Sequence, residues 1–236
     1  MKRNQIIVIV SVLLITFITG VTTMYFLYKE KYGIVRSATT ALTQIINSGT
    51  LTTDIVDASY VPVSSPSLAM SAKNFSFSCQ SSTGTLGTAT QQLYVQNPDA
   101  ADGGWTLTIA ATSGPTSFWH SNSSSASYDY NDSTSSGCTD GDDTDSLAGQ
   151  MTIDASSGTL AKGNCASCTV TNITKGSQAS FAESSVNSIT LLNAALGSDD
   201  IGDWKLTGVG ISQTIPPEQP AASDYSINLT ITVAAV

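Results

Sequence analysis

The sequence has 236 residues and a formal net charge of −9. Only four of its nine Lys and Arg lie beyond residue 50, against 17 of its 18 Asp and Glu, so this part carries a formal charge of −13. A surface this acidic repels nucleic acid and anionic lipid headgroups, so we expect no nucleic-acid partner. Charged residues make up only 11% of the chain, and small polar residues are abundant, a composition typical of secreted β-proteins.

Residues 6–28 form an apolar run, IIVIVSVLLITFITGVTTMYFLY, without a charged residue. A helix needs about 20 apolar residues to cross a bilayer, whereas a cleavable signal peptide has an apolar core of about 7–15. No clear small-x-small cleavage site follows the run. We therefore predict a cytoplasmic tip and an uncleaved single-pass transmembrane anchor over residues 1–29. Basic residues flank the run on both sides, so the orientation rests on the four cysteines, which favour an oxidising exterior for the remainder.

Residues 30–50 continue with a helical apolar pattern, in which Ile34, Ala38, Leu42 and Ile45 share one face. The pattern predicts an amphipathic stalk helix. A helix that is first apolar and then amphipathic also resembles a type IV pilin, although the pilin cleavage pattern and its glutamate five residues later are absent. Residues 51–72 contain Pro62 and Pro66 among small residues, which predicts a linker or a first edge strand.

Residues 73–236 consist of short alternating runs separated by turn residues, a pattern that indicates β-strands. The runs cover residues 75–79, 92–96, 105–109, 149–153, 188–192, 204–211 and 225–233. Strands of this length with turn signals between them predict a mainly β fold. We expect an antiparallel, immunoglobulin-like β-sandwich behind the N-terminal helix.

Two Trp-x-Leu triplets, Trp105-Thr-Leu107 and Trp204-Lys-Leu206, each lie in a predicted strand. Side chains two residues apart in a strand point to the same face, so each triplet can fill part of a sandwich core. The surroundings, GGWTLT early in the domain, DWKLT late, and a closing strand over residues 225–233, resemble the WxL domain of bacterial surface proteins.

The resemblance covers about residues 73–236. It implies a β-sandwich that attaches non-covalently to the cell wall through peptidoglycan and partner surface proteins, with Trp105, Leu107, Trp204 and Leu206 as candidate binding residues. The chain departs from the family in keeping a membrane anchor and in carrying an acidic loop that contains a cysteine.

The acidic loop spans residues 128–145. It holds six carboxylates, from Asp129, Asp132, Asp140, Asp142, Asp143 and Asp145. Ca²⁺ takes about 6–8 oxygen ligands and would relieve the repulsion among them. The spacing lacks the closing glutamate of an EF-hand loop. A structural Ca²⁺ and a solvated, disordered loop both remain open.

The four cysteines are Cys79, Cys138, Cys165 and Cys168, and they allow three pairings. We favour two disulfides, with Cys138 joined to Cys165 or Cys168. A zinc site usually needs two close Cys pairs, and only one is present. A redox Cys-x-x-Cys should open a helix after a strand, and this one lies in a turn, so the sequence argues against redox catalysis.

Signals for an enzyme are nearly absent. His120 is the only histidine, and neither a nucleophile elbow nor a phosphate-binding loop is found. The neighbouring aromatic residues could stack on sugars or cap the end of the sandwich; they are Phe118, Trp119, Tyr128 and Tyr130. We therefore expect a non-catalytic, membrane-anchored surface protein for wall association, adhesion or surface-layer assembly. The alternative is a self-assembling subunit of a pilin-like filament, with the N-terminal helix in the fibre core.

Overall fold

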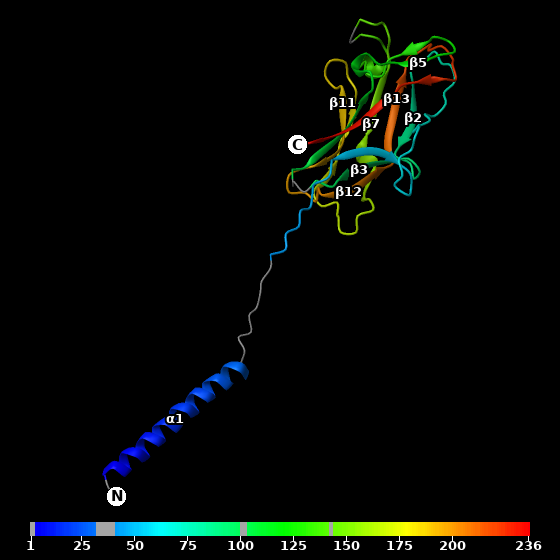
Figure 1. Ribbon diagram of the computed structural model, residues 1–236. Helices are drawn as coiled ribbons and strands as arrows, with labels where there is room; N and C mark the ends of the chain where they lie inside the picture. The colour runs from blue at the N-terminus through cyan, green and yellow to red at the C-terminus, as the bar shows by residue number, and fades with distance from the viewer. Residues whose placement is uncertain (1–2, 32–40, 100–102, 142–143) are drawn as a thin grey trace. The chain divides into compact units, whose positions relative to one another are not determined.

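The computed structural model describes residues 3–31, 41–99, 103–141 and 144–236 (Figure 1). Its internal contacts divide the chain into two units, residues 1–46 and 47–236. The first unit contains helix α1, Arg3–Lys31. Within α1, the segment Ile7–Tyr28 has a mean hydropathy of 2.4, so α1 is long and apolar enough to cross a membrane.

The threonines of α1 bond to their own helix. The hydroxyls of Thr16, Thr19 and Thr22 each donate to the carbonyl four residues earlier, at 3.0, 2.8 and 2.9 Å. These bonds satisfy the three threonine hydroxyls within the helix, as an apolar environment requires.

The predicted stalk helix does not form over its described part. Residues 41–50 have no regular secondary structure and are exposed, while residues 32–40 lie outside the described residues. The side chains of Leu42, Ile45 and Ile46 are 85–89% exposed. Most helical stability in proteins comes from packing an apolar face, and the apolar side chains of this face are exposed. The prediction of a helix over residues 41–50 is therefore wrong.

The second unit is mainly β, and its paired strands are antiparallel, which confirms the expected fold class. One sheet has the order β1–β3–β12–β8, a second β10–β7–β13–β2, and a third β15–β4–β11–β9; β14, β5 and β6 form a small sheet. Figure 1 shows β2, β13 and β7 side by side along the domain.

The strand bounds follow the sheets. They are β1 Thr52–Val56, β3 Gln92–Asn97, β12 Gly202–Thr207 and β8 Thr159–Lys162; β10 Gln178–Ser180, β7 Gln150–Asp154, β13 Val209–Ile215 and β2 Gln80–Leu86; β15 Leu229–Ala235, β4 Trp105–Ala111, β11 Ser188–Ala194 and β9 Ile173–Lys175; β14 Tyr225–Ser226, β5 Trp119–Ser121 and β6 Ser127–Tyr128. Three short 3₁₀ helices complete the described elements: η1 Gly114–Thr116, η2 Thr134–Gly137 and η3 Ala155–Ser157.

A single buried cluster joins the three large sheets in a sandwich-like arrangement. Strand β4 alternates buried and half-buried residues along its length, as the period-2 pattern predicts. Trp105 of β4 and Trp204 of β12 meet in this core, with ring centroids 5.4 Å apart. The run predicted over residues 204–211 forms two strands in different sheets, because Gly208 between them adopts a φ of +77°.

The domain begins earlier than residue 73. Strand β1 pairs with β3 over five residues at the edge of its sheet, and Val56 is 1% exposed. The edge-strand alternative for residues 51–72 therefore describes β1, which belongs to the sandwich.

The strand predicted over residues 75–79 does not form. Phe75 and Phe77 are 52% and 78% exposed and contact each other edge to face, with centroids 5.2 Å apart. In this segment, hydrogen bonds between backbone and side chains take the place of pairing with a neighbouring strand. Gln80 Nε2 donates to the Asn74 carbonyl at 2.8 Å, and the Ser78 N–H donates to Ser76 Oγ at 2.9 Å. Such local bonds compete with strand pairing.

The two disulfides join Cys79 to Cys138 and Cys165 to Cys168, with Cα–Cα separations of 5.6 and 5.8 Å. The favoured pairing of Cys138 with Cys165 or Cys168 is wrong. Cys138 caps η2, which packs beside β13, and Cys79 precedes β2, the neighbour of β13. Cys165 and Cys168 follow β8, which belongs to a different sheet.

Candidate ligand-binding groove

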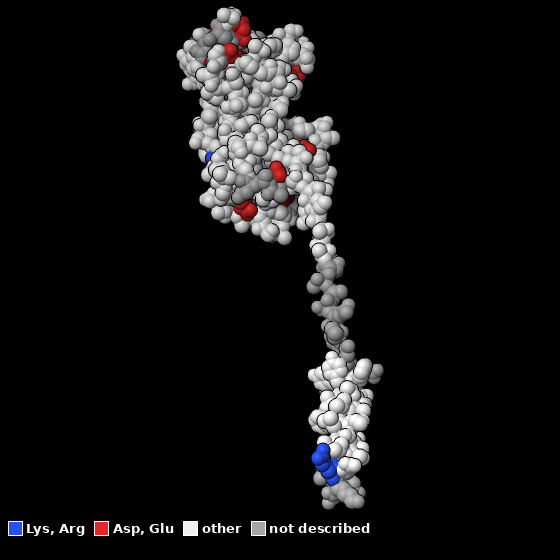
Figure 2. All heavy atoms as spheres, turned by 60° about the vertical axis from the view of Figure 1, so that its left-hand side comes forward, with Lys and Arg blue, Asp and Glu red and all other residues white. Residues whose placement is uncertain are grey.

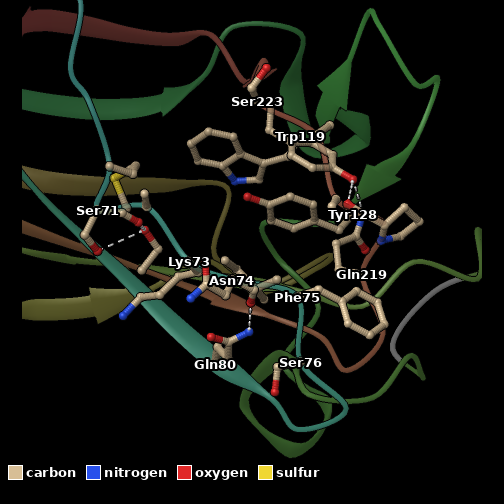
Figure 3. A pocket seen from close by; sticks show the side chains of 18 of the residues that line it. Ser71, Lys73, Asn74, Phe75, Ser76, Gln80, Trp119, Tyr128, Gln219 and Ser223 are labelled. Atoms are coloured by element: carbon tan, nitrogen blue, oxygen red, sulfur yellow. Dashed lines mark hydrogen bonds between the residues drawn. The ribbon is translucent and has the colours of Figure 1, made fainter.

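A groove of about 490 Å³ lies between residues 68–76, the β5–β6 hairpin and residues 215–225 (Figure 3). Its floor is aromatic. The rings of Trp119 and Tyr128 stack with centroids 5.7 Å apart and an interplanar angle of 5°, and Tyr225 meets Tyr128 edge to face at 5.1 Å. Figure 3 shows the two stacked rings at the centre of the view.

The aromatic floor is positioned by strand pairing. Trp119 of β5 lies opposite Tyr128 of β6, so both side chains point to the same face, and Tyr225 of β14 lies opposite Ser121. The Trp119 indole donates to Gln213 Oε1 at 2.9 Å, and the fully buried Gln213 donates in turn to the Asp129 carbonyl at 3.0 Å. This bonding fixes the indole orientation.

Asp224 connects the floor to the segment after β13. Its carboxylate accepts hydrogen bonds from the Ser121 hydroxyl, from the Ser123 N–H at 2.9 Å and from the Ser123 hydroxyl at 2.8 Å. The bonds from Ser121 and then Ser123 lower the pKa of Asp224. Asp224 therefore holds β14 against the hairpin in its ionised form.

The floor rings expose little of their surface. Trp119 is 9% and Tyr128 5% exposed, and burial, followed by the neighbouring Tyr225, raises the pKa of the Tyr128 hydroxyl. Gln219 Nε2 donates to the Ser127 carbonyl at 3.2 Å and to the Tyr225 hydroxyl at 2.7 Å. Part of the aromatic set thus packs against the chain's own proline-containing segment.

The rim carries the groups that a ligand can reach. Phe75 is half-exposed, and the exposed Lys73 makes no hydrogen bond or ion pair with any described residue. The ammonium groups of the three other lysines beyond residue 50 do make contacts: Lys162 donates to the Ala166 carbonyl, Lys175 to the Gly158 carbonyl and Lys205 to the Tyr60 hydroxyl. Figure 3 shows Lys73 and Phe75 on opposite sides of the groove, with Lys73 extending away from the stacked rings.

Lys73 is the one charged residue among those that line the groove, in a domain whose charge is mostly negative. On the face drawn in Figure 2, acidic side chains lie at several places on the domain, and basic side chains barely appear. The free ammonium of Lys73 is therefore a rare positive charge on this surface, and it is available to an anionic ligand group.

The four Trp-x-Leu residues do not line the groove. Trp105, Leu107, Trp204 and Leu206 are 0% exposed and belong to the core. The prediction that they bind a ligand directly is wrong, because no ligand can contact them while the domain stays folded. The period-2 geometry that places each Trp and Leu on one face points that face inward.

Tyr130 and Phe118 lie outside the groove as well. Tyr130 is 0% exposed and packs edge to face on Phe181 at 5.1 Å, so the prediction that it binds a ligand is wrong. Burial, and then the charges of Asp129 and Glu183, raise the pKa of Tyr130 to about 12. Phe118 is 42% exposed and contacts His120 edge to face at 6.0 Å. Of the predicted binding residues, the groove contains Trp119 and Tyr128.

The acidic loop divides into buried and exposed carboxylates. Asp129 and Asp132 are 2% and 1% exposed, whereas Asp140 and Asp145 are exposed, and Asp142 and Asp143 lie outside the described residues. Asp129 Oδ1 accepts from the Tyr130 N–H at 2.6 Å, and Asp132 Oδ1 from the Thr134 N–H at 2.8 Å. The expectation of a structural Ca²⁺ in this loop stays a prediction.

Among the described residues, one group of three potential metal ligands lies close together: Cys165, Cys168 and Asp203, with ligand atoms within 4.8 Å of one another. The two sulfur atoms are joined in a disulfide, so neither offers a thiolate in this state.

Sequence reasoning missed Lys73, Phe75 and Tyr225 as groove residues, and it missed Asp224 as the carboxylate that holds β14 against the β5–β6 hairpin. One signal was available, since Lys73 is the first of only four basic residues beyond residue 50. The contribution of Asp224 could not be found in this way, because its partners lie about 100 residues earlier in the chain.

Together, the fold and the groove define a class: a mainly β domain that follows one long apolar helix and carries a groove with an aromatic floor. Comparison with known proteins finds no matching family model, no matching curated protein and no matching solved structure.

Proposed function

We propose that this protein is a membrane-anchored bacterial surface protein whose β domain associates non-catalytically with the cell wall through the groove. The observation that carries the proposal is that the groove rim presents the half-exposed ring of Phe75 and the free ammonium of Lys73, in a chain segment of charge −13. Peptidoglycan offers sugar faces, which pack on aromatic rings, and peptide carboxylates, which pair with an ammonium.

The apolar helix supports the membrane part of the proposal. An anchor of about 20 apolar residues holds the protein at the membrane by itself, so wall binding is not needed for retention. Wall binding through the groove would instead link the membrane-anchored protein to the wall. The two buried tryptophans support the WxL-like part only as core residues, and wall contact falls to Lys73 and Phe75 on the rim.

The test is sedimentation of the full chain, in detergent micelles, with purified peptidoglycan. We expect the wild-type chain to sediment and the Lys73→Gln and Phe75→Ala variants to bind about tenfold more weakly, because each loses one contact of about 1.5 kcal/mol. Lys162→Gln is the matched control, since its ammonium bonds within its own loop, outside the groove. Absence of wild-type binding, or equal losses in all three variants, would refute the proposal.

A filament subunit is the second candidate, and one observation favours it. Leu42, Ile45 and Ile46 are 85–89% exposed directly before the β domain, although apolar surface of this kind is usually covered. Neighbouring copies of α1 and of this segment would cover it in a fibre. A Leu14→Cys variant tests this candidate: disulfide-linked dimers together with fibres by electron microscopy support it, and a purely monomeric product in membranes refutes it.

A further inference from the structure

The Cys165-Ala-Ser-Cys168 turn is built around one buried carboxylate. Asp203, 5% exposed, accepts hydrogen bonds from the N–H groups of Asn164 and Cys165, each at 2.7 Å. Its own carbonyl accepts from the Gly163 N–H at 2.7 Å. Tyr94 from the neighbouring strand β3 donates its hydroxyl to the same carboxylate. The turn is thus held by β12 at several points besides its disulfide.

Two glycines allow this close approach. A Cβ on Gly163 would overlap the Asp203 carboxylate, and a Cβ on Gly202 would lie 2.6 Å from Cys168 Sγ. Gly202 also adopts a φ of +151°, which disfavours other residues. At the far end of the turn, the Trp204 indole donates to the Thr169 carbonyl at 2.7 Å. These contacts do not depend on the S–S bond, so the turn can keep its conformation when that bond opens.

The two sulfur atoms differ in access. Cys165 is half-buried, whereas Cys168 is 7% exposed and packs against Gly202. The other disulfide, Cys79–Cys138, differs in the length of the loop that it closes. Cys79 and Cys138 are 59 residues apart, so opening their bond would release a long loop, whereas Cys165 and Cys168 are separated by three positions.

We propose that Cys165 and Cys168 form a reversible thiol–disulfide exchange site that reacts with dithiols of other surface proteins, independently of wall binding. A thiolate of the partner attacks Cys165 Sγ, the Cys165–Cys168 bond breaks, and Cys168 leaves and takes a proton from water. The partner's second thiol loses its proton and attacks the mixed disulfide, which releases Cys165. The partner dithiol is oxidised to a disulfide, and its two electrons reduce the pair.

Asp203 is a positioning residue that also sets the direction of exchange. Its carboxylate Oδ1 lies 3.8 Å from Cys168 Sγ, its carboxylate lies within 4.8 Å of Cys165 Sγ, and its backbone carbonyl oxygen lies 3.6 Å from Cys165 Sγ. A negative charge at this distance disfavours thiolates, and the turn provides no helix N-terminus to favour them. The pair therefore favours the disulfide, and we expect a strong dithiol to reduce it more readily than glutathione does.

The first experiment treats the full chain in detergent with increasing dithiothreitol, followed by alkylation and peptide mass mapping. The Cys79–Cys138 disulfide serves as the internal reference. We expect Cys165 and Cys168 to become alkylated at about tenfold lower dithiothreitol than Cys79 and Cys138, with unchanged tryptophan fluorescence, and to re-form their disulfide on oxidation. Prior or simultaneous reduction of Cys79–Cys138, or unfolding on reduction of the 165–168 pair, would overturn the proposal.

The second experiment tests the asymmetry with single cysteines. With glutathione disulfide, Cys168→Ser, which leaves Cys165, should form the mixed disulfide at least about tenfold faster than Cys165→Ser, which leaves the buried Cys168. The two variants should react equally in urea, which controls for intrinsic reactivity. Equal rates in the folded protein would contradict attack at Cys165.

A third experiment measures the effect of Asp203 on the Cys165 thiol. In the Cys168→Ser background, Asp203→Asn should shift the pH midpoint of Cys165 alkylation to lower pH by about one unit, because a negative charge is removed. Asp199→Asn is the matched control, since that carboxylate bonds the Thr169 N–H. An unchanged midpoint would assign Asp203 a purely structural role and would remove its directing effect from the proposal.

Discussion

Trp105 and Trp204 come from strands of two different sheets and meet in the core at an interplanar angle of 41°. Both are fully buried, and each is followed two residues later by a fully buried leucine. Large aromatic side chains dominate the energetics of a core of this size. At the scale of single residues, the Trp-x-Leu pattern is therefore a packing feature.

Replacing Trp204 by alanine should lower the free energy of unfolding by about 3–5 kcal/mol, because it leaves a cavity in the core and removes the bond to the Thr169 carbonyl. Urea denaturation followed by circular dichroism measures the change. Phe77→Ala is the control: this side chain is 78% exposed and its loss should cost less than about 0.5 kcal/mol. Similar costs for the two variants would contradict the assignment of Trp204 to the core.

A charged contact holds β14 against the β5–β6 hairpin beside the groove. Asp224 of the segment before β14 accepts three hydrogen bonds from Ser121 and Ser123 of the β5–β6 hairpin, and these bonds lower its pKa. A carboxylate with a lowered pKa stabilises the folded state above its usual value of 3.8, and this contribution is lost as the pH falls below that value.

We therefore expect acid to loosen β14 from the hairpin before the domain unfolds. The fluorescence of Trp119, which lies beside this contact, should change as the pH falls below about 4. Asp224→Asn should remove most of this change, and Asp54→Asn, at a carboxylate outside the groove, should leave it intact. A fluorescence change that is identical in wild type and Asp224→Asn would show that another group titrates.

The loop between β6 and β7 also contains carboxylates whose charge should affect the stability of the domain. Asp129 and Asp132 are almost fully buried, and burial of a carboxylate is costly unless its charge is compensated. We expect Ca²⁺ to raise the Tm of the full chain and Asp129→Asn or Asp132→Asn to reduce that rise. Asp99→Asn lies outside the loop and serves as the control. A Tm that does not respond to Ca²⁺ or to its chelation would contradict the calcium prediction.

At the scale of the whole molecule, the chain consists of a helix-containing unit and a β unit that begins at residue 47. We expect residues 47–236 to fold alone, with a Tm within a few degrees of that of the full chain. Residues 73–236 should be markedly less stable, because they lack β1, its five-residue pairing with β3 and the buried Val56. Equal Tm values for the two fragments would show that β1 is not part of the folding unit.

Much of the architecture is readable from local patterns. The uncharged run 6–28 predicts the apolar helix, and alternation predicts β3, β4, β7, β11 and much of β15, because burying one face of a strand requires a period of two. Alternation failed at residues 75–79, where side-chain bonds to the backbone replace the ladder. The helical apolar pattern failed at residues 41–50, where the apolar side chains are exposed.

Two features of the amino-acid sequence therefore determined the class of this protein: one apolar segment and a series of alternating strands. The tertiary structure decided the chemistry. It paired Cys79 with Cys138, placed Asp203 beside Cys165 and Cys168, and left Lys73 on the rim of the groove. The physical reason is the distance along the chain. Periodicity records which face of an element is buried, whereas the contacts of Cys79 with Cys138 and of Asp203 with the cysteine pair join residues 35 to 59 positions apart and exist only once the sheets have packed.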